Sequence, residues 1–193
     1  MRGHAHHLWF GLIALMTQLT VNGADPARAA TISWTNPAGG AWSTPANWST
    51  NSVPGAFDVA IIAEPGTYTV ALDLDVTIAG LTLGGGSGTQ TLQASGRALT
   101  LNGPGVSAAS GGLSLSSSTI GGSGSLAKSG TLELTGSTLA AAVSNAGLLR
   151  VMGYYGGSAI NGALTTAGGS TLRLEGFGSA LTVANGFTNN CTI

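Results

Sequence analysis

The chain has 193 residues, of which 32 are Gly and only 7% are charged, and its formal net charge is −1. An ordinary globular domain carries about 25% charged residues, so the composition offers no basic surface of the kind that binds nucleic acid or anionic lipid. Low charge with much Gly is also typical of disorder. However, 43% of the residues are hydrophobic and the aliphatic ones recur at regular places, which favours a buried core.

Residues 1–29 have the pattern of a secretory signal peptide. A polar start is followed by the apolar run 8–16 and by a small-x-small cleavage site at 27–29. The apolar run is shorter than the roughly 20 residues that a transmembrane helix requires. We therefore expect a secreted protein, extracellular or on the outer cell surface, with no membrane-spanning segment in this chain. A buried N-terminal helix is the alternative interpretation.

The segment 30–66 contains three of the four tryptophans, Trp34, Trp42 and Trp48. Aromatic faces suit sugar rings, so these three are candidate carbohydrate contacts. The other interpretation is a cap, because the first coil of a solenoid leaves backbone groups and one end of the core uncovered. Large rings cover apolar area efficiently, and we favour the cap.

Residues 67–193 repeat a short Leu-x-Leu pair that Gly closes on one or both sides. The copies begin at Leu81, Leu99, Leu113, Leu132 and Leu172, with a variant at Leu149. Apolar and polar residues alternate with the period of a strand, and the pairs recur about every 18 residues, which indicates a solenoid. The sequence predicts an all-β protein, a parallel β-helix whose aliphatic pairs stack in a single column along the axis.

An ordered series of motifs links the two segments: Gly-Gly-x-Trp-Ser, Ala-x-Asn-Trp-Ser, Val-Pro-Gly and Asp-Val-x-Ile, then Thr-Val-x-Leu-Asp and Leu-Thr-Leu-Gly. From Trp34 to Gly86 this series resembles the N-terminal region of secreted bacterial β-solenoid proteins, including autotransporter passenger domains and adhesin-like surface proteins. The resemblance implies a non-enzymatic structural or adhesive scaffold. It also implies contact with extracellular polysaccharide, matrix or a host cell surface. Residues 190–193 resemble one more strand without a cap, so we expect the remainder of a longer polypeptide.

The residues offer little catalytic chemistry. All three histidines, His4, His6 and His7, precede the apolar run, so a mature chain would lack a His-based triad or metal site. Cys191 has no evident base, and no Gly-rich run carries the Lys of a phosphate loop. We expect no enzyme activity, no cofactor and no metal.

Asp73 and Asp75 form the one paired acidic motif, and their spacing in an extended stretch predicts that both point to one face. They are a candidate calcium or polysaccharide site of the kind found in pectate-lyase-like β-helices. Calcium takes six to eight oxygen ligands, so we favour a solvated outward pair, with Leu72, Leu74 and Val76 inward.

Four further charged residues, Glu133, Arg150, Arg173 and Glu175, alternate with inward Leu and Val. We expect weak ion pairs between stacked coils. Two rival hypotheses remain open: a polysaccharide-binding or lyase-like β-helix, and a β-sandwich carbohydrate-binding module.

Overall fold

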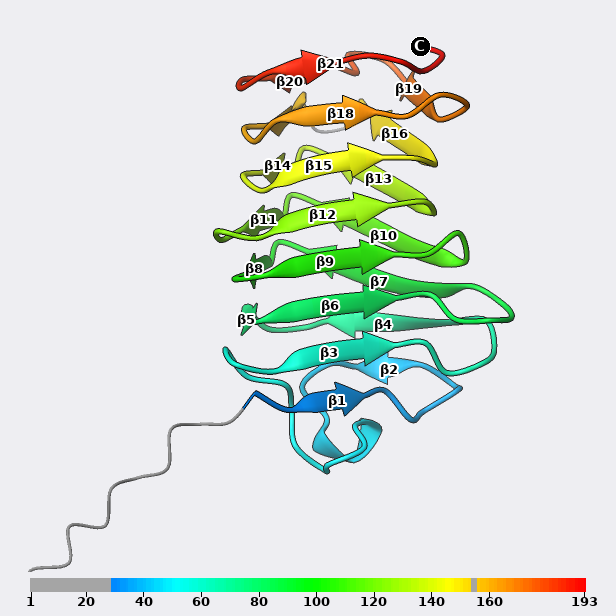
Figure 1. Cartoon of the computed structure of the whole chain (residues 1–193), viewed down its shortest axis with the longest axis vertical. Helices are drawn as coiled ribbons and strands as arrows, with labels where there is room; N and C mark the ends of the chain where they lie inside the picture. Colours follow the sequence, from blue (N-terminus) through cyan, green and yellow to red (C-terminus); the bar gives the residue numbers. More distant parts are fainter. Residues whose placement is uncertain (1–28, 154–155) are drawn as a thin grey trace, which may run out of the picture.

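The structure, a computed structural model, describes residues 29–153 and 156–193. These residues form 21 short strands and one short 3-10 helix, η1 (Pro45–Asn47), wound into a stack of coils (Figure 1). Every hydrogen-bonded pair of these strands is parallel. The predicted all-β parallel β-solenoid is therefore confirmed. The predicted signal peptide lies outside the described residues except for Ala29.

The strands lie in three sheets that run along the stack. The first sheet contains β1 (Thr31–Ser33), β3 (Val59–Ile62), β6 (Gly80–Leu83), β9 (Pro104–Ser107), β12 (Ser125–Lys128), β15 (Ala142–Asn145), β18 (Leu164–Thr166) and β21 (Phe187–Thr188). The second contains β2 (Gly40–Ala41), β4 (Tyr68–Leu72), β7 (Gln90–Ser95), β10 (Gly111–Ser116), β13 (Thr131–Thr135), β16 (Leu148–Met152) and β19 (Thr171–Glu175). The third contains β5 (Val76–Ile78), β8 (Ala98–Leu101), β11 (Thr119–Gly121), β14 (Thr138–Leu139), β17 (Ser158–Ile160) and β20 (Leu181–Val183).

Each coil passes through the first, second and third sheets in turn. The described residues make six complete coils, from β3–β5 to β18–β20, with β1 and β2 below them and β21 above. The register between neighbouring coils is irregular. It advances by 17 residues from Leu126 to Val143 and by 24 from Leu81 to Gly105. The strands keep their pairing because the corners between them absorb the difference in length.

The predicted single column of Leu-x-Leu pairs is correct only in part. The pairs that begin at Leu113, Leu132, Leu149 and Leu172 stack directly on one another in the second sheet. Leu81 lies in the first sheet and Leu99 in the third. The spacing of about 18 residues averaged steps within a coil and steps between coils, so it is not the true repeat.

The inward residues form one continuous core, from Ile32 in β1 to Leu172 in β19. At the corner between the second and third sheets, buried serines link successive coils. Ser118 accepts a hydrogen bond from the Arg97 N–H, Ser137 from the Ser118 N–H and Ser158 from the Ser137 N–H, at 3.1–3.2 Å. These hydroxyls pair amides that the corner would otherwise leave buried without a partner.

Close approach of the backbones explains the glycines at other corners. Gly122 has φ +98°, and a Cβ there would overlap the carbonyl oxygen of Leu101 in the coil below. A side chain would force these coils apart and would also strain the backbone. Next to it, Gly121 has open space where a Cβ would lie.

Candidate functional site

The three candidate tryptophans gather at the N-terminal end of the stack. Trp48 packs edge-on against both partners, with ring centroids 5.1 Å from Trp34 and 4.7 Å from Trp42. Each of the three side chains is at most 1% exposed. This cluster closes the end of the core, as the capping interpretation requires. It leaves no ring face open on which a sugar could stack.

Hydrogen bonds hold the same segment against the first strands. Trp34 and Trp48 form an antiparallel bridge beside β1, and the Ser49 N–H donates to the Ser33 carbonyl at 2.8 Å. The indole N–H of Trp48 donates to the Trp42 carbonyl at 2.8 Å. The side chain of Asn47 donates to the Ala41 carbonyl at 3.0 Å. The free edges of β1 and β2 are thus occupied by residues of the chain itself, so the segment is a backbone cap as well as an apolar one.

The candidate acidic pair lies at the corner between β4 and β5, outside any strand. Both carboxylates are on exposed residues, while Leu72 and Val76 are buried and Leu74 is partly buried. Asp73 accepts from the backbone N–H of Ser43, at 2.9 Å, and from its hydroxyl. Asp75 accepts from the Ala98 N–H at 2.9 Å. The two side chains therefore bond to the coils on opposite sides of their own, which is a structural role.

The pKa of Asp73 reflects these contacts. Desolvation by itself would raise the pKa, but the hydrogen bonds from Ser43 outweigh it and hold the pKa below the usual value. Within residues 29–153 and 156–193, no group of three or more His, Cys, Asp or Glu side chains is arranged to hold a metal ion.

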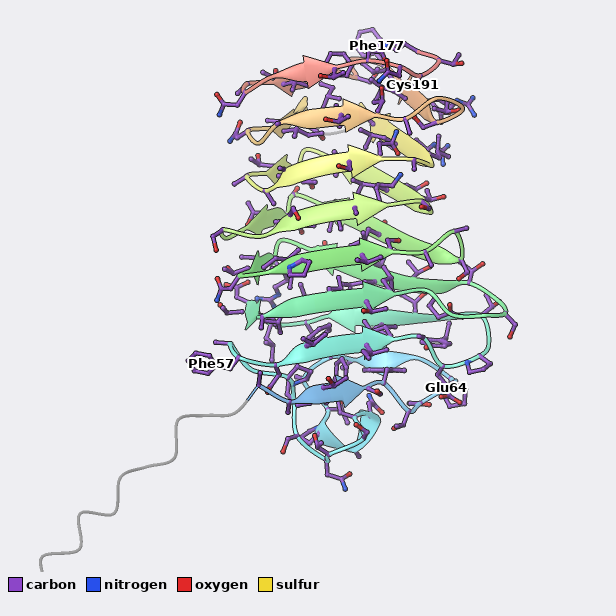
Figure 2. The ribbon with its side chains drawn as sticks, viewed as in Figure 1. Phe57, Glu64, Phe177 and Cys191 are labelled. Carbon is purple, nitrogen blue, oxygen red and sulfur yellow. The ribbon has the colours of Figure 1, made fainter. Side chains whose placement is uncertain are left out.

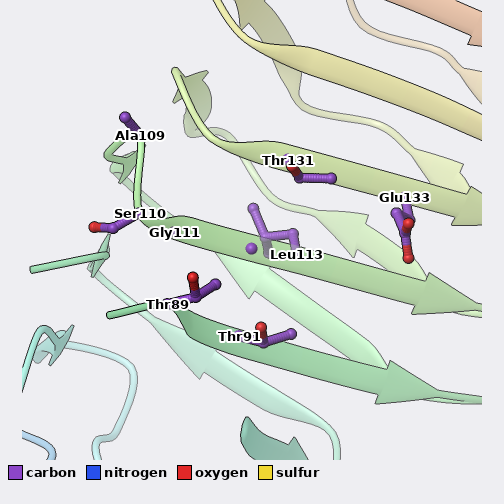
Figure 3. Close-up of a pocket in the computed structure, with 9 residues that line it drawn as sticks. Thr89, Thr91, Ala109, Ser110, Gly111, Leu113, Thr131 and Glu133 are labelled. Atoms are coloured by element: carbon purple, nitrogen blue, oxygen red, sulfur yellow. The ribbon is translucent and has the colours of Figure 1, made fainter. Parts of the chain in front are cut away.

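An open hollow on the outer face of the second sheet could take a ligand (Figure 3). Thr91, Gly112 and Thr131 are paired in register on β7, β10 and β13. Because Gly112 has no side chain, the row of threonines is interrupted there. The hollow is about 300 Å³ and is also lined by Ser110 and Glu133. Hydroxyls and one carboxylate around a shallow space suit a polar ligand with several hydroxyl groups.

This hollow was not predicted from the sequence. Its residues come together only through the pairing of Thr91 with Gly112 and of Gly112 with Thr131, which spans 21 and then 19 residues. No constant repeat length would place them side by side. The only available signal was a Gly at a position that is Thr in the neighbouring coils.

The charged residues beside the hollow pair as predicted. Arg150 lies between Glu133, at 2.8 Å, and Glu175, at 2.6 Å, and Arg173 also contacts Glu175 at 2.9 Å. The hydrogen bonds from Arg150 to Glu175 and Glu133 raise the pKa of its guanidinium. This ion-pair chain runs along the outer face from β13 to β19.

A polar column also lies inside the coils, and it was not predicted from the sequence. At the end of the first sheet, Ser107, Lys128, Asn145 and Thr166 stack in register and are each at most 2% exposed. The Lys128 ammonium donates to the Asn145 side-chain oxygen at 2.6 Å and to the Leu148 carbonyl at 2.9 Å. Desolvation lowers the pKa of Lys128 from 10.5 to about 8.

Comparison of the chain with protein-family models, with curated proteins and with solved structures found no match. The resemblance to autotransporter and adhesin-like proteins therefore remains an interpretation of the sequence motifs. In the part of the chain that the structure describes, no helix has the length and hydropathy needed to cross a bilayer.

Proposed function

We propose that this chain is a non-enzymatic scaffold segment of an exported, autotransporter- or adhesin-like surface protein. The observation that carries the proposal is the uninterrupted stack itself. One core runs from the tryptophan cap to the sixth coil, and side chains at the corners bond to the backbone of adjacent coils. Such a stack holds its outer faces at a fixed spacing, which is what a display scaffold requires.

Export is tested by expressing the full chain in a bacterial host with an outer membrane. We expect the chain to leave the cytoplasm and to lose residues 1–29, as measured by fractionation and intact mass. Leu12→Arg, which places a charge in the apolar run, is the control and should keep the chain unprocessed. An uncleaved wild-type chain that stays in the cytoplasm would contradict the proposal.

The scaffold role is tested by removing one coil. Deletion of residues 113–131 joins Gly112 to Leu132, which occupies the register position of Leu113 in the next coil. Because each coil contacts mainly its neighbours, the shortened chain should still fold cooperatively, with the circular dichroism of a β protein. A scaffold that cannot lose a coil without unfolding would not fit this role.

The hollow around Gly112 favours a second candidate function, binding of a polysaccharide. Gly112→Val would fill the hollow, since an added Cβ lies 3.1 Å from the Thr91 hydroxyl. Gly121→Val, in open space on the third sheet, is the matched control. If the candidate is correct, calorimetry with neutral and acidic polysaccharides should show binding that only Gly112→Val removes. No heat with any polysaccharide, and no absorbance from an unsaturated product, would eliminate it.

A further inference from the structure

The hollow on the second sheet is surrounded by polar side chains from two strands and one corner. Thr91 and Thr131 lie on either side of it, and Ser110 and Glu133 lie toward its two ends (Figure 3). Because β7 and β13 are two strands apart, the backbones at Thr91 and Thr131 are separated by about 9–10 Å across Gly112. A pyranose ring with a hydroxyl on each edge spans such a gap when both hydroxyls form hydrogen bonds of ordinary length.

The polar groups around the hollow keep hydrogen-bonding capacity for a ligand. The Glu133 carboxylate uses its Oε1 for the Arg150 guanidinium, at 2.8 Å, so its Oε2 can accept from a ligand hydroxyl. The Ser110 hydroxyl donates to the Gly85 carbonyl at 2.7 Å, and its oxygen can still accept. Each threonine hydroxyl can both donate and accept. Donors and acceptors of this kind match a ligand that is rich in hydroxyl groups.

We propose that the hollow binds a neutral sugar unit and that the Glu133 carboxylate selects it. This inference rests on the second candidate function, polysaccharide binding, and adds to it the class of sugar and the selecting residue. A hydrogen bond to an ionised acceptor is about twice as strong as one between neutral groups. A sugar hydroxyl that donates to Glu133 should therefore supply a large share of the affinity.

The distribution of charge disfavours an acidic sugar. Of the described residues that line the hollow, Glu133 is the single charged one. Arg150 lies between Glu133 and Glu175, at 2.8 and 2.6 Å, so two carboxylates already compensate its charge. A uronate or sulfate group in the hollow would lie beside a like charge, and such a juxtaposition is unfavourable.

Recognition in the hollow depends on hydrogen bonds, because none of its described lining residues is aromatic. Phe57 and Phe177, which are 61% and 100% exposed, lie near the two ends of the stack, away from β10 (Figure 2). The hollow has a volume of about 300 Å³, at the lower limit of small-molecule sites. The contact is therefore limited to one or two sugar units, and the rest of a chain would extend into solvent.

The test uses the full chain with four disaccharide probes in ligand-observed NMR: cellobiose, maltose, mannobiose and digalacturonate. At least one neutral probe should bind in the millimolar range, and digalacturonate should bind at least tenfold more weakly. Glu133→Gln should weaken binding of the neutral probe about tenfold and should narrow its advantage over digalacturonate. Glu175→Gln is the matched control. It removes the other carboxylate that contacts Arg150 but does not line the hollow, so binding should stay unchanged.

Gly112→Val separates failure of this inference from failure of the candidate function. If Gly112→Val abolishes binding but Glu133→Gln does not weaken it, the hollow binds sugar and the role of Glu133 is wrong. Equal affinity for digalacturonate, or an equal loss in Glu175→Gln, would overturn the inference in the same way. If no probe binds, or if Gly112→Val leaves binding intact, the candidate function fails and the inference fails with it. Fluorescence of the buried tryptophans verifies that each variant is folded.

Discussion

At the N-terminal end of the solenoid, Trp34, Trp42 and Trp48 are almost completely buried, whereas at the C-terminal end Leu174, Phe187 and Phe177 are two-fifths to fully exposed. Both ends are formed by the outermost strands of the same three sheets, so the difference comes from the residues that follow or precede those strands. The N-terminal segment folds back and supplies both apolar rings and hydrogen-bond donors. A solenoid end is therefore closed only when one segment satisfies the core and the backbone together.

The largest expected effect on stability comes from replacing one aromatic residue at each end with Ala. Trp48→Ala should lower the free energy of unfolding by about 3–5 kcal/mol, because it opens a cavity beneath the first coil and removes the Trp48–Trp42 hydrogen bond. Phe177→Ala should change it by less than about 0.5 kcal/mol, since its side chain is in solvent. Urea unfolding measures both. Equal losses in the two variants would remove the distinction between a closed and an open end.

The buried Lys128 gives a test of the middle coils, which lie between the two ends. Because the pKa of Lys128 is about 8 in the folded chain and near 10.5 when unfolded, the unfolded state binds more protons between these values. The free energy of unfolding should therefore rise as the pH increases from 8 toward 10, by at most about 3 kcal/mol.

Lys128→Met is the control, because it should abolish this rise. Lys128 is also the single lysine of the sequence, so amine-reactive reagents should label the native chain at its N-terminus and leave the side chain unmodified. A pH dependence that persists in Lys128→Met would assign it to another group.

The polar side of the cap has a smaller expected contribution. Asn47→Ala removes hydrogen bonds to the Ala41 carbonyl and from the Asn36 amide, and should cost about 1–3 kcal/mol because it leaves a polar group without a partner. Asn190→Ala, on an exposed residue at the C-terminal end, should be within about 0.5 kcal/mol of the wild type. Thermal unfolding of the pair distinguishes a hydrogen-bonded cap from one held by the tryptophans alone.

The smallest effect is expected in acid. Asp73, which joins the cap to the first complete coil through Ser43, has a folded pKa below its usual value of 3.8. The contribution of Asp73 to the free energy of unfolding is thus present above the usual pKa, and it is lost as the pH falls through the pKa of the folded state. Ser43→Ala should make the unfolding of the cap, followed by tryptophan fluorescence, less sensitive to pH in this range. An unchanged acid profile would show that the Ser43 contacts carry no stability.

The sequence by itself determined which side chains of the strands point into the core, through its alternation of apolar and polar residues. Because side chains on a strand alternate between its faces, Leu132-Glu133-Leu134 alone predicts which residues lie inside, and the tryptophan-rich segment indicated where the stack begins. The outward direction of Glu133, Arg150 and Glu175 follows from the same local rule.

Only the tertiary structure decided which residues of different coils lie side by side. The corners vary in length, so the register between complete coils advances by 17 to 24 residues, and no fixed repeat assigns Leu81 and Leu99 to different sheets. The hollow at Gly112 depends on that pairing. So does the burial of Lys128, because its charge is tolerated inside only where the Asn145 side chain and the Leu148 carbonyl of the next coil accept hydrogen bonds from its ammonium group.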